Sequence, residues 1–384
     1  MTVYLDNAAT SFPKPQSVVD AVQRCMIRDG GNPGRGSHAL SAAAARTVYA
    51  CREELCSLFD VSSPEQVCFT LNTTSAINTL VKGVLRRGDH VLISDLEHNA
   101  VWRPLHKLCR EGLITLDVFR SYACDAERND EAILRDIRRK LRPNTKMILC
   151  TALSNLCGVT LPLRRIGTLC QRHGILFAVD AAQGAGHLTL SLAKDHIDAL
   201  CLPAHKGLYG PQGCGVLLLR EGLTPDTLIE GGNGMDSLSP NMSDSLPERM
   251  EAGTLPVPAI AGLCEGIRAV KRIGIEALSA HEAYLHQVAR DRLACFRGLT
   301  VYAPHACGPC LLFSVADRPS EEICALLNEY GICARGGFHC AALAHKTLGT
   351  PQGGAVRLSF GMYNRPRDLE YVYRALSSVC QHVI

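Results

Sequence analysis

The sequence predicts an α/β fold with a large domain and a smaller second domain. At 384 residues the chain is long for a single hydrophobic core. Hydrophobic residues make up 47% of it and charged residues 20%, which is usual for a globular protein. Short apolar runs alternate with amphipathic segments at the spacing of βαβ units. We therefore expect strands and helices to alternate along the first half of the chain.

The elements of this first half can be assigned in order. A helix over residues 129–141 would place Ile133, Ile137 and Leu141 on one face, and Pro143 would end it. Gly174 would end another helix. The expected helices cover residues 75–84, 129–141 and 162–173, and the expected strands cover residues 67–70, 90–94, 146–153, 175–180, 199–202 and 215–219.

The pattern becomes looser after Gly222. Residues 230–247 are polar and contain several glycines, which is typical of an active-site lid, of a dimer-contact loop or of a plain surface connection. Residues 256–297 look mainly helical and should lead into the second domain. There we expect strands over residues 310–315 and 356–359 and a helix over residues 320–330.

Charge and cysteine content argue against several classes of protein. The 40 basic and 37 acidic residues leave a net charge of +3, which gives no indication of a nucleic-acid or membrane partner. No apolar run is long enough to cross a bilayer, and the first residues lack the features of a signal peptide. The 19 cysteines are scattered through an α/β pattern, which favours reduced thiols and a cytoplasmic location.

Two of the expected strands lead directly into charged groups. Asp180 follows one apolar run, and His205 and Lys206 follow the next. Open α/β sheets bind ligands beyond the carboxyl ends of their strands. A carboxylate facing a lysine there matches pyridoxal 5'-phosphate, because the lysine forms a Schiff base with the aldehyde and the acid pairs with the pyridinium nitrogen. The glycines that follow Lys206 permit a close approach of the backbone.

Polar side chains near other strand ends can complete such a cofactor site. Thr73 and Thr74 lie where a strand gives way to a helix, so they either hold a phosphate or simply cap the helix. His98 either stacks on a pyridine ring or is an ordinary loop residue. Gln183 can donate a hydrogen bond to the phenolic oxygen of the cofactor, and Asn155 can serve that oxygen or a substrate carboxylate.

A second cluster of residues indicates sulfur chemistry. Cys340 lies in the segment Arg335-Gly-Gly-Phe-His339-Cys340-Ala341. A thiolate is a nucleophile, and nearby positive charge lowers the pKa of a thiol. We expect Arg335 and His339 to supply that charge. Arg357 begins a strand-like segment shortly afterwards, and its guanidinium matches a substrate carboxylate in bidentate geometry.

The segment Cys307-Gly-Pro-Cys310 has the spacing of a redox pair. A metal site would need a second such pair, which is absent from the sequence, so no metal site is expected. No thioredoxin-like pattern surrounds the motif. A turn before a strand is therefore the favoured interpretation, and a redox or sulfur-relay role is the alternative.

These motifs resemble, in order, those of the cysteine desulfurase and selenocysteine lyase family, which belongs to the class V aminotransferase group of fold-type-I pyridoxal phosphate enzymes. The resemblance runs from Tyr4-Leu-Asp-Asn-Ala-Ala9 to Arg357-Leu-Ser-Phe-Gly-Met-Tyr-Asn364. The arginine, the glycine and the His-Cys-Ala around Cys340 resemble the family's short-loop class. The other matching segments are Asn72-Thr-Thr74, Glu97-His98-Asn99, Ser154-Asn155, Val179-Asp180-Ala-Ala-Gln183, His205-Lys206 and Glu251-Ala-Gly-Thr254.

The resemblance implies a fold-type-I transferase. Its large domain, over residues 13–262, would hold a mostly parallel mixed sheet, and a smaller α+β domain over residues 263–384 would carry Cys340. Residues 1–12 would pack with the small domain. The resemblance also implies a homodimer with composite active sites, in which Thr254 reaches the phosphate of the neighbouring subunit.

Pro203 departs from the family pattern. A phosphate-binding serine is common there, whereas proline has neither a hydroxyl nor a backbone donor. His205 and the turn at Thr73 and Thr74 would then carry more of the phosphate binding. We therefore predict weaker retention of the cofactor.

The activity implied by the resemblance is conversion of L-cysteine to L-alanine. Lys206 and His98 would handle protons, and Cys340 would take the sulfur as a persulfide for a protein acceptor. A selenocysteine lyase, which would act on L-selenocysteine and pass on selenium, is one alternative. Another class V aminotransferase or C–S lyase is a second. A non-enzymatic sulfur-acceptor scaffold is a third, which the intact set of Asp180, Lys206 and Arg357 disfavours.

Overall fold

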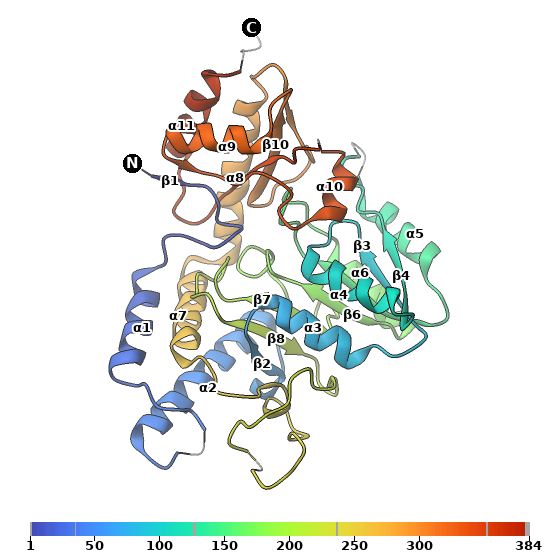
Figure 1. Cartoon of the computed structure of the whole chain (residues 1–384), viewed down its shortest axis with the longest axis vertical. Helices are drawn as coiled ribbons and strands as arrows, with labels where there is room; N and C mark the ends of the chain where they lie inside the picture. The colour runs from blue at the N-terminus through green and yellow to red at the C-terminus, as the bar shows by residue number, and fades with distance from the viewer. Residues whose placement is uncertain (1, 35, 126–127, 236, 351, 381–384) are drawn as a thin grey trace.

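Within residues 2–34, 36–125, 128–235, 237–350 and 352–380, which the computed structural model describes, a seven-stranded sheet forms the centre of the large domain (Figure 1). The strand order is β2-β8-β7-β6-β5-β3-β4, and β8 runs antiparallel to both of its neighbours while the other pairs are parallel. The strands are β2 Val67–Thr70, β3 Asp89–Ser94, β4 Ile114–Phe119, β5 Thr145–Thr151, β6 Leu176–Asp180, β7 Ala199–Pro203 and β8 Gly215–Leu219. The expected α/β class and the mostly parallel mixed sheet are confirmed.

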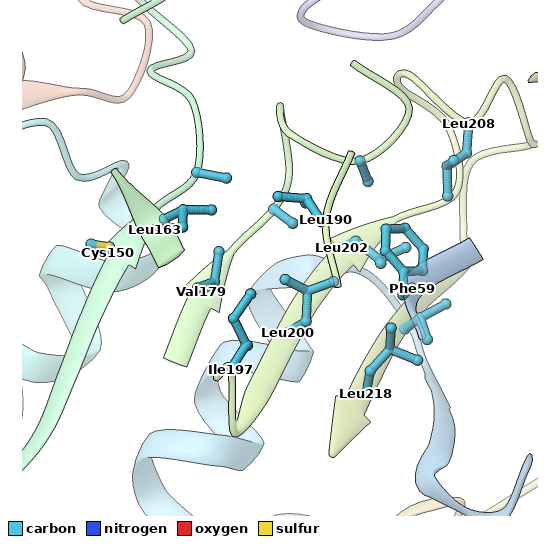
Figure 2. Packing of buried hydrophobic residues seen from close by; sticks show 14 of the residues in the cluster. Phe59, Cys150, Leu163, Val179, Leu190, Ile197, Leu200, Leu202, Leu208 and Leu218 are labelled. Carbon is cyan, nitrogen blue, oxygen red and sulfur yellow. The ribbon is translucent and has the colours of Figure 1, made fainter. Parts of the chain in front are cut away.

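The two faces of this sheet bury alternate residues of each strand, as the two-residue period requires. Val179, Leu200 and Leu218 point to one face, where they belong to the same cluster as Phe59 of α2 (Figure 2), and Ala178 points to the other. The helices over the first face are α1 Gln16–Ile27, α2 Ala39–Phe59, α5 Asp130–Lys140, α6 Leu163–His173 and α7 Val257–Ile273, and those over the second are α3 Thr73–Val84 and α4 Asn99–Arg110. None of the helices in the described ranges has the length and apolar character needed to cross a membrane.

A second, smaller core lies around an antiparallel sheet of order β12-β10-β9. The N-terminal segment joins this core, because Val3 and Leu5 are buried in it and β1 pairs with β11. We propose on this ground that residues 2–12 form part of the small domain. Its elements are β1 Val3–Tyr4, α8 Ile275–Leu293, β9 Leu299–Val301, β10 Cys310–Val315, α9 Ser320–Glu329, β11 Ile332–Cys333, β12 Val356–Ser359 and α11 Pro366–Ser377.

We propose that the link between the two domains lies further along the chain than the expected boundary at residues 262 and 263. That position falls inside α7, and Ile260 and Ile267, on either side of it, both pack in the core of the large sheet. The helix ends before Gly274, whose φ of 91° suits glycine, and α8 buries Leu285 in the small core. We therefore propose Gly274 as the boundary.

One helix from the C-terminal part of the sequence packs on the large domain. This helix, α10 (Ala342–Leu348), buries Ala344 and Leu348 in the core of the large sheet. Figure 1 shows α10 above β3 and α4. The arrangement brings Cys340, which lies two residues before this helix, close to the start of α4, the helix that follows β3.

Candidate active site

A cavity of about 110 Å³ lies beyond the carboxyl ends of β5, β6 and β7. A larger hollow of about 850 Å³ lies inside the loop over residues 227–249, but its lining contains no lysine. Thr254 is exposed on its own loop and does not line the small cavity. The cavity brings together eight of the predicted residues, namely Thr73, Thr74, His98, Asn155, Asp180, Gln183, His205 and Lys206.

Asp180 and Lys206 influence one another across this cavity. Burial raises the pKa of Asp180, while the N–H of Ala182, 2.8 Å from Oδ1, and the charge of Lys206 act in the opposite direction. Burial lowers the pKa of Lys206 to about 8, against the attraction of Asp180. A larger fraction of Lys206 is therefore neutral near pH 7 than of an ordinary lysine, and only a neutral amine is nucleophilic. A buried carboxylate in turn favours a cationic partner.

The turn before α3 leaves its threonine hydroxyls uncommitted to helix capping. The cap is Asn72, whose side chain accepts a hydrogen bond from the Ser75 N–H at 2.9 Å, so the interpretation of Thr73 and Thr74 as a simple cap is wrong. Among the described residues, Thr73 Oγ1 and His205 Nδ1 are buried without a hydrogen-bond partner. Both residues line the cavity, and two unsatisfied buried polar atoms, one of them at the start of α3, suit a phosphate.

His98 is the N-cap of α4 rather than an ordinary loop residue. Its Nδ1 accepts a hydrogen bond from the Ala100 N–H at 3.0 Å. Burial lowers the pKa of His98 to about 4, and the charge of Lys206 adds to this effect. The imidazole is therefore neutral near pH 7, with its proton on Nε2. A neutral, fixed ring at the cavity wall is compatible with stacking on a pyridine.

The two predicted amide ligands already bond within the protein. Gln183 Nε2 donates to the carbonyl of Ala8 at 2.8 Å, which leaves only one of its N–H groups for a ligand. Asn155 Nδ2 donates to the carbonyl of His339 at 3.0 Å. In this arrangement Asn155 joins the cavity to the Cys340 segment rather than to a ligand.

Arg357 is buried, with 2% of its surface exposed, beside the same segment. Nη2 donates to Asp6 Oδ1 at 2.7 Å, and Nη1 donates to the carbonyl of Asn155 at 2.9 Å. Nε has no partner among the described residues. A buried guanidinium whose Nε–H is open is suited to receive a carboxylate.

Cys340 is exposed and is held close to α4. Its carbonyl accepts a hydrogen bond from the Asn99 N–H at 2.7 Å. Burial, together with the cation of Arg357, lowers the pKa of the preceding His339 to about 3. His339 is therefore neutral, and the expectation that it supplies positive charge to the thiol is wrong. Arg335 is the remaining cation from the predicted motif.

Several residues that contact the site were not predicted from the sequence as site residues. Ser11 Oγ donates to the carbonyl of Lys206 at 2.8 Å, and Lys14 Nζ donates to that of His205 at 2.9 Å. Glu97 is fully buried, and burial raises its pKa to about 8. Its Oε1 accepts a hydrogen bond from the Thr151 N–H at 2.9 Å. The position of Glu97 beside His98 could have suggested a role, whereas the contacts of Ser11 and Lys14 join segments far apart in sequence.

The Cys307–Cys310 segment forms a turn that leads into β10, as the favoured interpretation expected. Cys307 is exposed, whereas Cys310 is buried and burial raises its pKa to about 12. The Gly308 N–H donates to the carbonyl of Gly158 at 3.1 Å. All 19 cysteines are free thiols, and in the described ranges no group of three or more histidine, cysteine or acidic side chains could hold a metal ion. A redox role for this pair stays a prediction.

Comparison with known proteins places this geometry in a family. The model of the class V aminotransferase family matches residues 3–372. The chain belongs to the class V aminotransferase family. It is 30% identical to a probable cysteine desulfurase of Methanothermobacter thermautotrophicus, over 98% of this chain and 94% of that one.

Solved structures of other family members have the same fold. The apo cysteine desulfurase from Thermococcus onnurineus NA1 superposes with a TM-score of 0.89 at 28% identity, over 98% of this chain and 94% of that one. The cysteine desulfurase CsdA from Escherichia coli superposes with a TM-score of 0.85 at 27% identity, over 98% and 94% of the two chains. The predicted family and fold type are thereby confirmed.

The cavity fits the cofactor of this family, pyridoxal 5'-phosphate. Lys206 and Asp180 offer an amine and an acid of the kind that its aldehyde and ring nitrogen need. The unsatisfied atoms of Thr73 and His205 suit its phosphate. Pro203 lines the same cavity and offers that phosphate no donor, as expected from the sequence.

Proposed function

We propose that this chain is a cysteine desulfurase that converts L-cysteine to L-alanine and keeps the sulfur as a persulfide on Cys340. The observation that carries the proposal is the 2.7 Å hydrogen bond from the Asn99 N–H to the Cys340 carbonyl. Asn99 is the first residue of α4, and its neighbour His98 lines the cofactor cavity, so this bond holds the backbone of Cys340 next to a residue of that cavity. The names of the relatives support a sulfur substrate and do not favour a selenocysteine lyase.

The cofactor would be held by groups at the carboxyl ends of the strands. Lys206 would bind its aldehyde, Asp180 its ring nitrogen, and Thr73, Thr74 and His205 its phosphate. His98 would lie against its ring. When bound, pyridoxal phosphate supplies an electron sink for carbanion character at the substrate α-carbon.

The chain's own residues would carry out the remaining steps. Arg357 would hold the substrate carboxylate through its open Nε–H. Lys206 would remove the α-proton, with His98 assisting proton transfer. The thiolate of Cys340 would attack the substrate sulfur. A new S–S bond forms, the carbon–sulfur bond breaks, and its electron pair passes to the substrate carbon, which takes up a proton to give alanine.

We also propose that the enzyme is a homodimer with composite active sites, located in the cytoplasm, and that a protein acceptor collects the sulfur. Thr254 would reach the neighbouring subunit's phosphate, which fits its exposure away from its own cavity. Large apolar side chains are exposed near the site and on the loop before Thr254, including Leu71 at 66%, Ile229 at 69% and Leu238 at 102%. Clusters of such side chains usually mark interfaces. The dimer-contact interpretation of residues 230–247 is therefore preferred to a plain surface connection.

Purified holoenzyme assayed with L-cysteine tests the activity. Wild type should form alanine, and Cys340→Ala should lower the rate at least about a hundredfold while leaving the absorption of the bound cofactor unchanged. Cys295→Ala, which removes another exposed thiol, should match wild type. Alanine formation by Cys340→Ala at the wild-type rate, or pyruvate as the main product, would contradict the proposal. L-selenocysteine in parallel separates the two substrates.

A further inference from the structure

Two buried histidines lie on the side of Cys340 that faces α10. His339 directly precedes Cys340, and His345 lies in α10. Only 9% of His339 and 5% of His345 is exposed. Their rings are parallel to within 11°, with centroids 5.7 Å apart. Neither residue lines the cofactor cavity, so the chemistry proposed above does not use them.

The hydrogen-bonding roles of this pair follow from the partner at one end. His339 Nε2 lies 3.0 Å from the carbonyl of Arg335, which can only accept, so Nε2 carries a proton. Burial lowers the pKa of His339 to about 3 and that of His345 to about 4, so both rings are neutral near pH 7. His339 Nδ1 is then an acceptor that faces His345 Nε2 at 3.5 Å. The Phe338 carbonyl is a second acceptor within reach of His345.

The donor and the acceptor on the His345 side of the pair are assigned in the same way. Because His345 Nε2 carries the proton, His345 Nδ1 must accept. The hydroxyl of Thr350 lies 2.7 Å from it and is the donor. The result is a one-directional chain of hydrogen bonds from Thr350 through His345 and His339 to the backbone of Arg335.

The backbone supported by this series of hydrogen bonds is strained. His339 has a φ of 49° and Cys340 a φ of 53°, and both lie in the left-handed region that residues with a Cβ avoid. Such a conformation costs free energy relative to an ordinary backbone. The backbone carbonyls here are held by Asn99 and Asn155, and the side chain of His339 is held by His345. A strained pair at a nucleophile persists only where its surroundings fix it.

We propose that His345 is a positioning residue for the Cys340 thiol and acts through His339 and the Phe338 carbonyl. The inference rests on the proposed function, because positioning matters only if Cys340 attacks a substrate sulfur. A thiolate must approach the sulfur in line with the bond that breaks, and a displacement of about 1 Å can cost roughly a hundredfold in rate. His345 does not line the cofactor cavity, and in this role it would touch neither substrate nor cofactor and would contribute no proton.

Two replacements of His345 separate positioning from simple packing. His345→Gln keeps an N–H donor close to the place of Nε2, whereas His345→Leu keeps the volume and removes every hydrogen bond. We expect His345→Leu to lower the rate of alanine formation in single turnovers by about ten- to a hundredfold. The KM for L-cysteine and the cofactor absorption should stay close to wild type. His345→Gln should restore at least half of the loss on a logarithmic scale.

The reactivity of Cys340 towards iodoacetamide supplies a readout that does not need the enzymatic reaction. Alkylation mapped by peptide mass spectrometry should change severalfold in rate in His345→Leu and return towards wild type in His345→Gln. His173→Leu, at an exposed histidine at the end of α6, is the matched control and should change neither rate. If wild type made no alanine from L-cysteine, the proposed function would fail, but the alkylation rates would still test the histidine pair.

Thr350→Val keeps the test available if His345→Leu does not fold. This substitution removes the hydroxyl that donates to His345, and valine is nearly the same size as threonine. It should lower the rate of single-turnover alanine formation about threefold or more. Rates of alanine formation and alkylation within twofold of wild type in every folded His345 and Thr350 variant would overturn the proposal. So would equal losses in His345→Leu and His345→Gln, because packing alone would then explain them.

Discussion

Asp180 and the segment of Lys206 follow adjacent parallel strands, whereas Cys340 lies in a loop between β11 and α10. On the cofactor side, β6 and β7 are fixed by pairing inside a seven-stranded sheet of the described residues. On the thiol side, two adjacent residues have left-handed backbones and are held by a few side-chain and backbone hydrogen bonds. The difference teaches that pairing within the sheet fixes the positions of the groups on the cofactor side. On the thiol side, local contacts of the loop set the position of Cys340.

Removing the cofactor's covalent partner should give the largest effect. Lys206→Ala should lower alanine formation at least about a thousandfold, because no other amine lines the cavity in the described residues. Borohydride reduction followed by peptide mapping should label the peptide of Lys206 in wild type and nothing in the variant. Lys194→Ala, at an exposed lysine after β6, should behave as wild type. A label on another lysine would contradict the assignment of Lys206 as the covalent partner of the cofactor.

Arg357 lies where the two sides meet, and changing it should have the next largest effect. Arg357→Lys should raise the KM for L-cysteine by about a hundredfold with a smaller change in kcat, because an ammonium is a compact point charge without the planar fork that spaces the donors to Asp6, the Asn155 carbonyl and a carboxylate. Steady-state kinetics measure this, with Arg318→Lys, from an exposed ion pair, as the control. An unchanged KM would mean that the substrate carboxylate binds elsewhere.

Acid should destabilise the protein through buried histidines, which lie on both sides of the site and, for His286, in α8. Burial lowers the pKa values of these groups to between about 3 and about 4, below the ordinary value of about 6.5. At pH values between the folded and the unfolded pKa, the unfolded chain binds more protons than the folded one. The free energy of unfolding therefore falls as the pH drops from 6.5 to 4. The groups are His98, His205, His286, His339 and His345.

We expect this loss to reach at least about 2 kcal/mol, or roughly thirtyfold in the unfolding equilibrium. Urea unfolding of the cofactor-free protein at pH 6.5, 5 and 4 measures it. His345→Gln should flatten the dependence, while His173→Gln, at an exposed histidine, should not. A free energy of unfolding that does not change over this range would show that the buried imidazoles are already charged.

Pro203 should give the smallest effect and the finest test of the cofactor side. Pro203→Ser adds a hydroxyl at the cavity wall, whereas Pro203→Ala adds only the backbone N–H. One additional hydrogen bond to the phosphate should tighten cofactor binding about three- to tenfold in the serine variant relative to the alanine variant. Fluorescence titration of the cofactor-free protein measures the Kd. Equal affinities would mean that Thr73, Thr74 and His205 already satisfy the phosphate.

Most of the secondary structure could be predicted because it follows from local pattern. The strands at residues 67–70, 215–219 and 310–315 were assigned with their observed bounds, since each is an apolar run between turns. The helix α4 was missed, although His98 was singled out, because Pro104 and several charged residues obscure its pattern. The strand β4 was missed because it is largely half-buried and has no clear alternation.

The sequence by itself determined the α/β class, the acid and amine that follow adjacent strands, and the order of motifs that predicts the family. These features depend on neighbours along the chain, which periodicity and spacing reveal. Only the tertiary structure decided that Asn72 caps α3, that Asp6 pairs with Arg357, and that His339 is neutral. The physical reason is that desolvation and the choice of hydrogen-bond partner depend on groups brought together from distant parts of the chain.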